Sequence, residues 1–282
     1  MTRRIAFVVL LALVLAPHSF AGTWVKSVGA AQKAAQEKNQ LILVDLFAEW
    51  CGWCHRFERE VFPAAVFQNA TKDIVLLRLD TEDQGEGTQF ARKYSISSLP
   101  TFLVLAPDLT IAGMIRGYAP PDEFVARLAE TRKNYAGFLQ RVKNEPKMGK
   151  DWVQRLALAK EFTSRGSYDK SVPRFKQLTI EKGVPAALRD DAYYQLAYTY
   201  ALQKKYDDGL KTIKQLNSLS KLGEAVEQSQ LLAGNIYLSQ GNLQGARNQF
   251  KAFIETFPES QYAANVEAML SEIERRLSAG MK

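Results

Sequence analysis

The chain has 282 residues, of which 46% are hydrophobic and 24% are charged, so it is long enough for two ordinary domains with separate cores. Its net charge is +7, and the basic excess is spread evenly along the chain, which excludes the concentrated basic face of a nucleic-acid-binding protein. The 2 cysteines are too few for a disulfide framework, and their closeness in sequence indicates local chemistry instead.

Residues 1–21 have the pattern of an export signal. Arg3 and Arg4 precede an apolar run over residues 5–16, and Ser19-Phe20-Ala21 places small residues where a signal peptidase reads. We expect cleavage after Ala21, which leaves a net charge of +5. The alternative is an uncleaved anchor, but the run is shorter than the roughly 20 apolar residues of a spanning helix. We therefore predict export, with no stable membrane span after cleavage.

Residues 22–143 show the alternating pattern of an α/β domain. The predicted elements are a helix over 22–38, a buried strand over 41–47, a helix from 54 to about 69 that Pro63 interrupts or bounds, a strand over 74–79, a loop over 81–87, a helix over 89–94, strands over 101–105 and 111–115, and a helix from 121 to about 142. This order predicts helices layered on a sheet of mixed strand direction.

Residues 144–150 form a predicted linker, and residues 151–282 have helical period throughout. Three segments of this half align without gaps. Their equivalent positions are Leu158-Ala159, Leu196-Ala197 and Ala233-Gly234; Phe162, Tyr200 and Tyr237; Ser171, Gly209 and Ala246; and Phe175, Ile213 and Phe250. Small residues at such positions let paired helices approach closely, while aromatic residues fill the space between units.

The aligned segments resemble tetratricopeptide repeats. The resemblance implies about three helix pairs and a capping helix over residues 259–278. Two departures are Ser171 and Gly209 in place of the usual alanine, and the register steps of 38 and 37 residues exceed the roughly 34 of the family. A generic helical bundle is the alternative interpretation.

The strongest chemical signal is Cys51-Gly52-Trp53-Cys54 directly after the strand predicted over residues 41–47. Cysteines three positions apart on a first helical turn share one face, so they can form a disulfide. The helix N-terminus stabilises a thiolate at Cys51 and lowers its pKa. We expect Cys51 to be the exposed attacking sulfur and Cys54 to be the more buried resolving sulfur.

Two other interpretations of the cysteine pair carry less weight. A zinc site usually needs four ligands, and after signal removal His55 is the one histidine left. An inert structural disulfide would close a loop too small to constrain the unfolded chain much. No metal and no organic cofactor is therefore expected, and the Cys51–Cys54 pair itself would be the redox centre.

Together these features resemble the thioredoxin superfamily over roughly residues 25–140. Asp45 lies within the first apolar strand, where an isolated carboxylate is costly unless it has a purpose. The resemblance implies that Asp45 is the buried aspartate that accepts a proton from Cys54. Burial should raise its pKa, which suits that role. A capped or solvated aspartate is the alternative.

The resemblance also implies a substrate-binding surface beside the disulfide. Leu99, Pro100 and Thr101 match the loop in which the family has a cis-proline, and Gly117 matches a glycine that faces the same surface. Leu99 is larger than many family members carry there. Pro100 could instead be an ordinary residue at a strand entry, and Gly117 an ordinary turn residue.

The residues around the cysteines would tune the pair. These are Trp50, Gly52, Trp53 and His55, although His55 fits a helix-surface residue better than a redox-tuning residue. Trp53 replaces the proline usual in cytosolic thioredoxins, and this leaves the redox direction open. Residues 57–62 and 80–83 are similar to the thioredoxin domains of bacterial envelope disulfide-reduction systems. That similarity favours a reductase or isomerase over an oxidase, in the periplasm or secreted.

We therefore predict an α/β thioredoxin-like domain followed by an all-α tetratricopeptide-like repeat domain. The expected function is thiol–disulfide oxidoreduction, with proteins that contain disulfides or oxidised cysteines as substrates and an unidentified redox-recycling partner. The repeats would bind a peptide or protein ligand in a groove, which by resemblance is lined by Lys160, Tyr194, Tyr198 and Asn235. They could instead stabilise the fold or form a dimer. The alternative function is an envelope scaffold or chaperone-like binding protein.

Overall fold

The computed structural model describes residues 24–279, which fall into two compact units. The first comprises residues 24–108 and 114–129, and the second comprises residues 109–113 and 130–279. The predicted export signal lies outside the described residues. Within residues 24–279, no helix combines the length and the apolar character that crossing a membrane requires.

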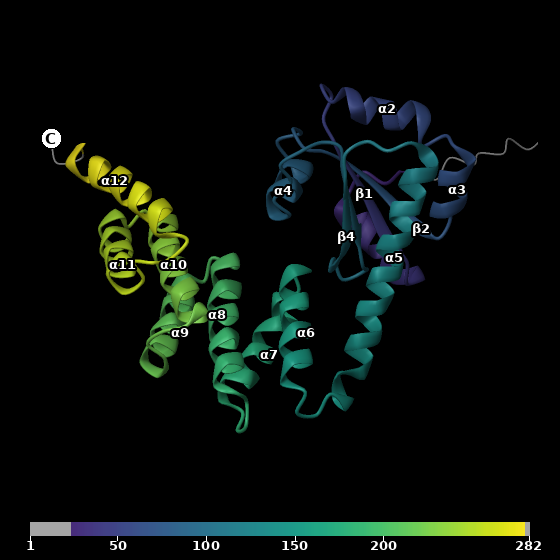
Figure 1. Cartoon of the computed structure of the whole chain (residues 1–282). Coiled ribbons are helices and arrows are strands. Elements are labelled where there is room, and N and C mark those ends of the chain that lie inside the picture. The colour runs from purple at the N-terminus through teal and green to yellow at the C-terminus, as the bar shows by residue number, and fades with distance from the viewer. Residues whose placement is uncertain (1–23, 280–282) are drawn as a thin grey trace, which may run out of the picture. The chain divides into compact units, whose positions relative to one another are not determined.

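The first unit is built around a four-stranded sheet. Its elements are α1 (Val28–Lys38), β1 (Leu41–Phe47), α2 (Gly52–Glu60), α3 (Ala65–Thr71), β2 (Ile74–Asp80), α4 (Glu86–Lys93), β3 (Thr101–Leu105), β4 (Ile111–Arg116) and the start of α5 (Pro121–Asn144). The strand order is β2-β1-β3-β4; β1 pairs parallel with β2 and antiparallel with β3. In Figure 1 the sheet lies between α4 on one side and α3 with the start of α5 on the other.

The predicted strands are confirmed, while two helices differ from prediction. The first helix begins at Val28 rather than at residue 22, because Val25 forms a parallel bridge to Leu77 and is part of the sheet edge. The helix predicted over residues 89–94 begins earlier, at Glu86, within the segment predicted as a loop. The predicted interruption of the helix after the cysteines is confirmed, because α2 ends at Glu60 and α3 begins at Ala65. Pro63 lies between them, where its missing N–H and fixed φ stop helix propagation.

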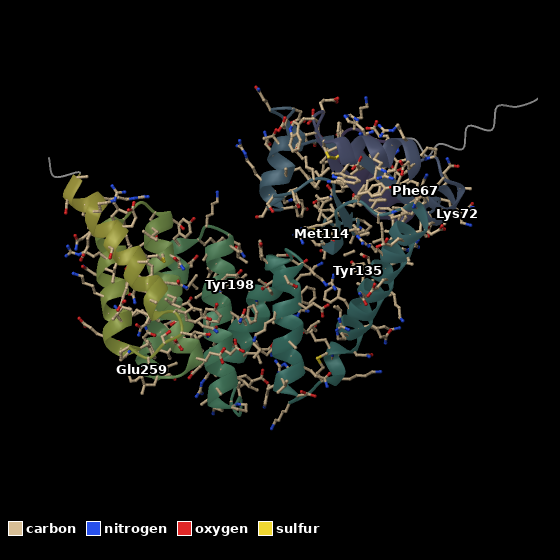
Figure 2. The ribbon with its side chains drawn as sticks, turned by 45° about the horizontal axis from the view of Figure 1, so that its top comes forward. Phe67, Lys72, Met114, Tyr135, Tyr198 and Glu259 are labelled. Atoms are coloured by element: carbon tan, nitrogen blue, oxygen red, sulfur yellow. A yellow bond between two sulfur atoms is a disulfide. The ribbon has the colours of Figure 1, made fainter. Side chains whose placement is uncertain are left out.

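Aromatic side chains form the centre of the first core. Phe57 of α2 packs against Phe102 of β3 and Phe124 of α5, with ring centroids 4.7 Å and 5.2 Å away. Phe67 of α3, labelled in Figure 2, lies 6.0 Å from Phe124. Because these rings come from a strand and three helices, their burial fixes the position of α2 against the sheet, and with it the position of the cysteines.

The second unit is a series of paired helices, as predicted. They are α6 (Trp152–Ser164), α7 (Tyr168–Ile180), α8 (Ala186–Leu202), α9 (Tyr206–Leu219), α10 (Glu224–Ser239), α11 (Leu243–Thr256) and the terminal α12 (Ala263–Ala279). The first helices of neighbouring pairs also contact one another, since α8 packs on both α6 and α10.

Small residues permit the close packing of each pair. Ala159, Ala197 and Ala246 are fully buried in the clusters that join the helices. Gly234 of α10 is the tightest of these positions, because a Cβ atom there would lie 2.2 Å from Cε1 of Phe250 in α11. The α10–α11 pair therefore depends on the absence of a side chain at this residue.

This contact gives a stability prediction with a matched control. Gly234→Ala should lower the free energy of unfolding of the repeat unit by about 1–3 kcal/mol, because the buried Phe250 ring must shift. Gly137→Ala, in α5 of the same unit, meets Arg141 Nη1 at an ordinary 3.6 Å and should stabilise by up to about 1 kcal/mol through helix propensity. Urea unfolding followed by circular dichroism measures both. Equal effects of the two variants would contradict the packing argument.

Candidate active site

The cysteine pair lies where the central strand β1 passes into α2. Cys51 is the N-cap residue of α2, and its Sγ accepts a hydrogen bond from the Cys54 amide at 3.2 Å. Cys51 and Cys54 form a disulfide with their Cα atoms 5.2 Å apart, and the bond is seen in yellow in Figure 2. The backbone amides at this helix start would stabilise negative charge on Cys51 once the disulfide opens.

The exposure of the cysteines differs from expectation. Cys51 is only 4% exposed, against 1% for Cys54, so the expectation of an exposed Cys51 is wrong for the disulfide form. The reason is that the disulfide ties the Cys51 sulfur back to the first turn of α2. The order of exposure still places Cys54 deeper.

Asp45 is buried in β1 and has one ionic partner. Its neighbour across the sheet is Arg78 of β2, whose Nε lies 3.2 Å from Asp45 Oδ2. The predicted burial of Asp45 is therefore confirmed, and the carboxylate has a charged neighbour that the sequence pattern did not indicate. The pair is nevertheless poorly aligned, because neither Arg78 Nε nor Asp45 Oδ1 has a hydrogen-bond partner among the described residues.

Burial decides the protonation behaviour of Asp45. Loss of solvation raises its pKa from 3.8 to about 7, although the positive charge of Arg78 lowers it and Glu58 contributes a smaller rise. An ion pair without an aligned hydrogen bond compensates only part of the desolvation cost. Near neutral pH, Asp45 can therefore either accept or donate a proton.

Arg78, for which no role was predicted, connects Asp45 to the surface. Its guanidinium pairs with Glu58 of α2 and lies 4.0 Å from the centre of the Phe47 ring. His55 continues the chain of charges, with Nδ1 3.6 Å from Glu58 and Nε2 donating to the Glu49 carbonyl at 2.7 Å. The sequence feature that could have indicated this interaction is Arg78 itself, because it is a charged residue within an apolar strand, as Asp45 is.

Two exposed tryptophans flank the disulfide. Trp50 is 69% exposed and its Nε1 donates to Glu82 at 2.8 Å. Trp53 is 54% exposed and lies 5.3 Å from the ring of Tyr118, over which the Arg56 guanidinium sits at 4.6 Å. Large apolar surfaces that are held in place beside a reactive group are typical of protein-contact sites.

The loop before β3 contributes a small cavity beside Trp50. The cavity measures about 190 Å³ and is lined by Trp50, Thr81, Ile96, Ser97, Ser98 and Leu99. The Leu99–Pro100 peptide bond is cis, and the Pro100 carbonyl accepts a hydrogen bond from the Gly117 amide at 3.0 Å. Leu99 is thus the member of this predicted set whose side chain borders a cavity next to the cysteines.

Thr101 and Gly117 differ in what they offer a substrate. Thr101 is fully buried and its hydroxyl donates to the Ser98 carbonyl at 2.7 Å, so its side chain supports the loop and does not face a substrate. Because β3 is buried throughout, a substrate contact at Thr101 would have to come from its backbone. Gly117 has a φ of 76°, a turn conformation that favours glycine, and a Cβ there would meet open space.

The four predicted groove residues lie in the repeat unit. Lys160 of α6 pairs with Asp191 of α8 at 2.5 Å. Tyr194 and Tyr198 stack on α8 with ring centroids 6.3 Å apart, and Asn235 is exposed on α10. Among residues 24–279, no three histidine, cysteine, aspartate or glutamate side chains converge in a way that could hold a metal ion.

The raised pKa of Asp45 predicts how stability depends on pH. Between about pH 4 and pH 7 the folded state holds a proton on Asp45 that the unfolded state releases, so the free energy of unfolding falls as pH rises. Asp45→Asn removes this dependence. Its stability relative to the parent should therefore increase from pH 4.5 to pH 8, by on the order of a few kcal/mol in the disulfide form.

Urea unfolding at the two pH values measures this difference. Glu37→Gln, an exposed carboxyl-to-amide change on α1, is the matched control and should alter stability little at either pH. An Asp45→Asn effect of the same size at pH 4.5 and pH 8 would show that the carboxyl is not buried as described.

Comparisons with known proteins agree with this architecture. Residues 28–132 match the family model of a thioredoxin-like domain, and residues 128–275 match that of a tetratricopeptide repeat-like domain. The chain is 34% identical over 117 residues to the thiol:disulfide interchange protein DsbD of Pseudomonas fluorescens, and 31% identical over 114 residues to that of Yersinia enterocolitica.

These matches cover 39% and 40% of this chain, and the chain spans only 20% and 18% of the length of the two relatives. The solved C-terminal domain of Neisseria meningitidis DsbD is 16% identical, with a TM-score of 0.34 over 39% of this chain and 100% of that domain. The chain therefore belongs to the tetratricopeptide repeat-like family, and it carries a thioredoxin-like domain ahead of its repeats.

Proposed function

We propose that this chain is an exported thiol–disulfide oxidoreductase of the bacterial envelope that acts as a reductase or isomerase. The observation that carries the proposal is the Cys51–Cys54 disulfide at the start of α2, preceded on β1 by a buried Asp45 with a pKa of about 7. A structural disulfide would need neither the helix start nor the buried carboxyl. The similarity to thiol:disulfide interchange proteins supports the same chemistry.

In the reducing direction the reaction starts from the Cys51 thiolate. This sulfur attacks one sulfur of a substrate disulfide, so the substrate S–S bond breaks, a Cys51–substrate disulfide forms, and the other substrate sulfur leaves as a thiolate that takes up a proton. Cys54 then loses its proton to the Asp45 carboxylate and attacks Cys51. The substrate leaves as a dithiol, and two electrons have passed from the cysteine pair.

The cysteine pair would itself be the redox centre, with no organic cofactor or metal in the reaction. Each turnover leaves the Cys51–Cys54 disulfide, so a second protein dithiol must restore the reduced form. Trp50, Trp53 and the cavity bordered by Leu99 provide the apolar surface on which a substrate segment would lie while its disulfide meets Cys51. The repeat unit would hold a protein partner, as its family similarity supports.

Trapping of the mixed disulfide tests the order of attack. Cys54→Ser should accumulate a covalent adduct with a disulfide substrate such as insulin, because Cys51 can attack but nothing resolves the product. Cys51→Ser should form little or no adduct, because Cys54 lies deeper than Cys51 and lacks the N-cap position that stabilises a thiolate. Non-reducing gels and mass spectrometry distinguish the two. Equal adducts from both variants would contradict the assigned roles, and no adduct from either would favour the scaffold interpretation.

The reduction potential tests the direction of electron flow. Equilibration against glutathione or dithiothreitol, with thiol trapping, should give a value nearer to about −270 mV, typical of a reductase, than to about −120 mV, typical of an oxidant. A value near the second figure would reverse the proposed direction while it keeps the redox role. A pair that never exchanges with either couple would refute the redox role itself.

A further inference from the structure

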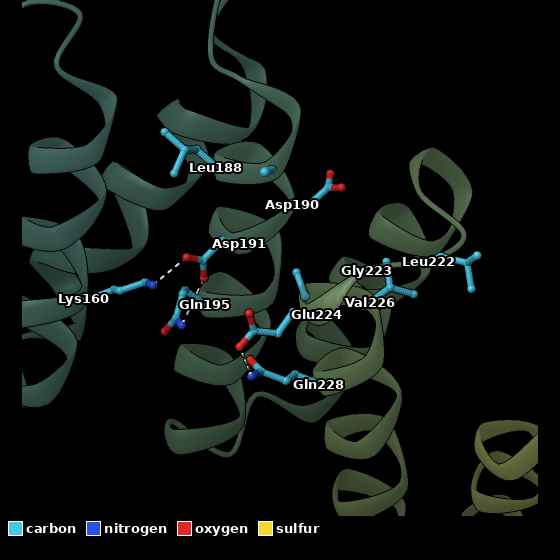
Figure 3. Close-up of a pocket in the computed structure, with 12 residues that line it drawn as sticks. Lys160, Leu188, Asp190, Asp191, Gln195, Leu222, Gly223, Glu224, Val226 and Gln228 are labelled. Carbon is cyan, nitrogen blue, oxygen red and sulfur yellow. Dashed lines mark hydrogen bonds and ion pairs between the residues drawn. The ribbon is translucent and has the colours of Figure 1, made fainter. Parts of the chain in front are cut away.

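A large cavity opens in the repeat unit between the first helices of successive pairs. It measures about 680 Å³, within the size range of ligand sites. Figure 3 shows its lining, which comes from α6, from α8, and from the start of α10 with the two residues before it. Of the four residues predicted for the groove, Lys160 lines this cavity, whereas Tyr194, Tyr198 and Asn235 do not.

The lining carries an excess of negative charge. Asp190, Asp191 and Glu224 contribute three carboxylates, whereas Lys160 contributes the one ammonium group among the lining residues. The Lys160 Nζ lies 2.5 Å from Asp191, so that pair is neutral overall. Two carboxylates therefore remain without a cation in the lining, in a chain whose net charge is +7.

Neutral donors hold these carboxylates in place. The Ser220 hydroxyl donates to Asp190 Oδ2 at 2.5 Å, and the Gln228 amide donates to Glu224 Oε1 at 3.0 Å. These hydrogen bonds orient the two carboxylates. Because the donors are neutral, each carboxylate keeps its negative charge. Glu224 also lies in the first turn of α10, where it offsets part of the positive partial charge of the helix start. Asp190 lies beyond the first turn of its own helix, α8.

Apolar and aromatic groups border the same carboxylates. Leu188, Val226 and Leu222 line the cavity, and Leu222 is 70% exposed. Tyr194 follows Asp190 and Asp191 by one helical turn on α8 and stacks with Tyr198, which is labelled in Figure 2. Aromatic faces and carboxylates both attract cationic side chains, while the leucines require an apolar partner.

We propose that this cavity binds an extended segment of a partner protein in which lysine or arginine residues lie next to apolar residues. The cationic groups would pair with Asp190 and Glu224, and the apolar side chains would cover Leu188 and Leu222. A metal ion does not fit, because apolar side chains make up much of the lining. The proposal concerns binding alone and does not depend on the redox chemistry of the first unit.

Fluorescence anisotropy with a labelled peptide of alternating lysine and leucine tests this proposal on the chain without its export signal. Two matched probes replace every lysine with glutamine or with glutamate. The lysine peptide should bind at least about tenfold more tightly than either. Non-specific attraction would give the opposite order, because the chain without residues 1–21 has a net charge of +5 and favours the acidic peptide. Raising the salt from about 50 to about 300 mM should weaken binding.

Variants locate the site. Asp190→Asn with Glu224→Gln should weaken binding of the lysine peptide by about tenfold. The matched control is Asp207→Asn with Glu255→Gln, the same chemical changes at exposed positions of α9 and α11 outside the cavity, and it should change binding less than about twofold. Circular dichroism establishes that each variant keeps its helices.

The outcomes separate this proposal from the proposed function. Binding should persist when Cys51 and Cys54 are both replaced by serine, since neither lies in the repeat unit. Equal affinity for the lysine and glutamate peptides would overturn the proposal, as would a loss of binding in the control variant equal to that in the cavity variant. Because the peptide series uses the parent chain, the first of these outcomes is decisive even if a variant fails to fold.

Discussion

The burial of one carboxyl group in the central strand governs the redox unit. Asp45 lies on β1, the strand that pairs with both β2 and β3, so it cannot reach solvent without the loss of the sheet. The nearby Arg78 provides an opposite charge without an aligned hydrogen bond, and the desolvation cost therefore stays largely uncompensated. As a result, the protonated and ionised forms of Asp45 are close in free energy at neutral pH. Asp45 lies in the strand that leads directly to Cys51.

The same strand also leads to the helix start that can stabilise a thiolate. β1 ends at Phe47, and α2 begins at Gly52 with Cys51 as its cap. The aromatic core around Phe57 holds α2 against the sheet and thereby fixes the position of the helix start that carries the disulfide. Packing in the core and reactivity at the surface thus depend on the same helix.

In the repeat unit, the carboxylates that line the cavity are not buried as Asp45 is. Its interior is joined by small residues such as Ala197 and Gly234, whereas Asp190 and Glu224 line an open cavity, where ionisation costs less than in a buried strand. The buried carboxyl of the first unit therefore suits the proposed proton transfer, and the cavity carboxylates of the second unit suit the proposed recognition of a cationic partner. Asp45 and Asp190 belong to the same residue type, and their surroundings alone give them different chemistry.

Local pattern was enough to define much of this protein from its sequence. The apolar runs gave the strands, the repeated small and aromatic positions gave the helix pairs, and the Cys51–Cys54 spacing gave the disulfide, because each depends on neighbours a few residues away. The tertiary structure decided what lies across the sheet or between helices: the pairing of Asp45 with Arg78, the inward turn of Thr101, and the gathering of Asp190 and Glu224 around one cavity. These contacts join residues far apart in sequence, and no local period encodes which of them meet.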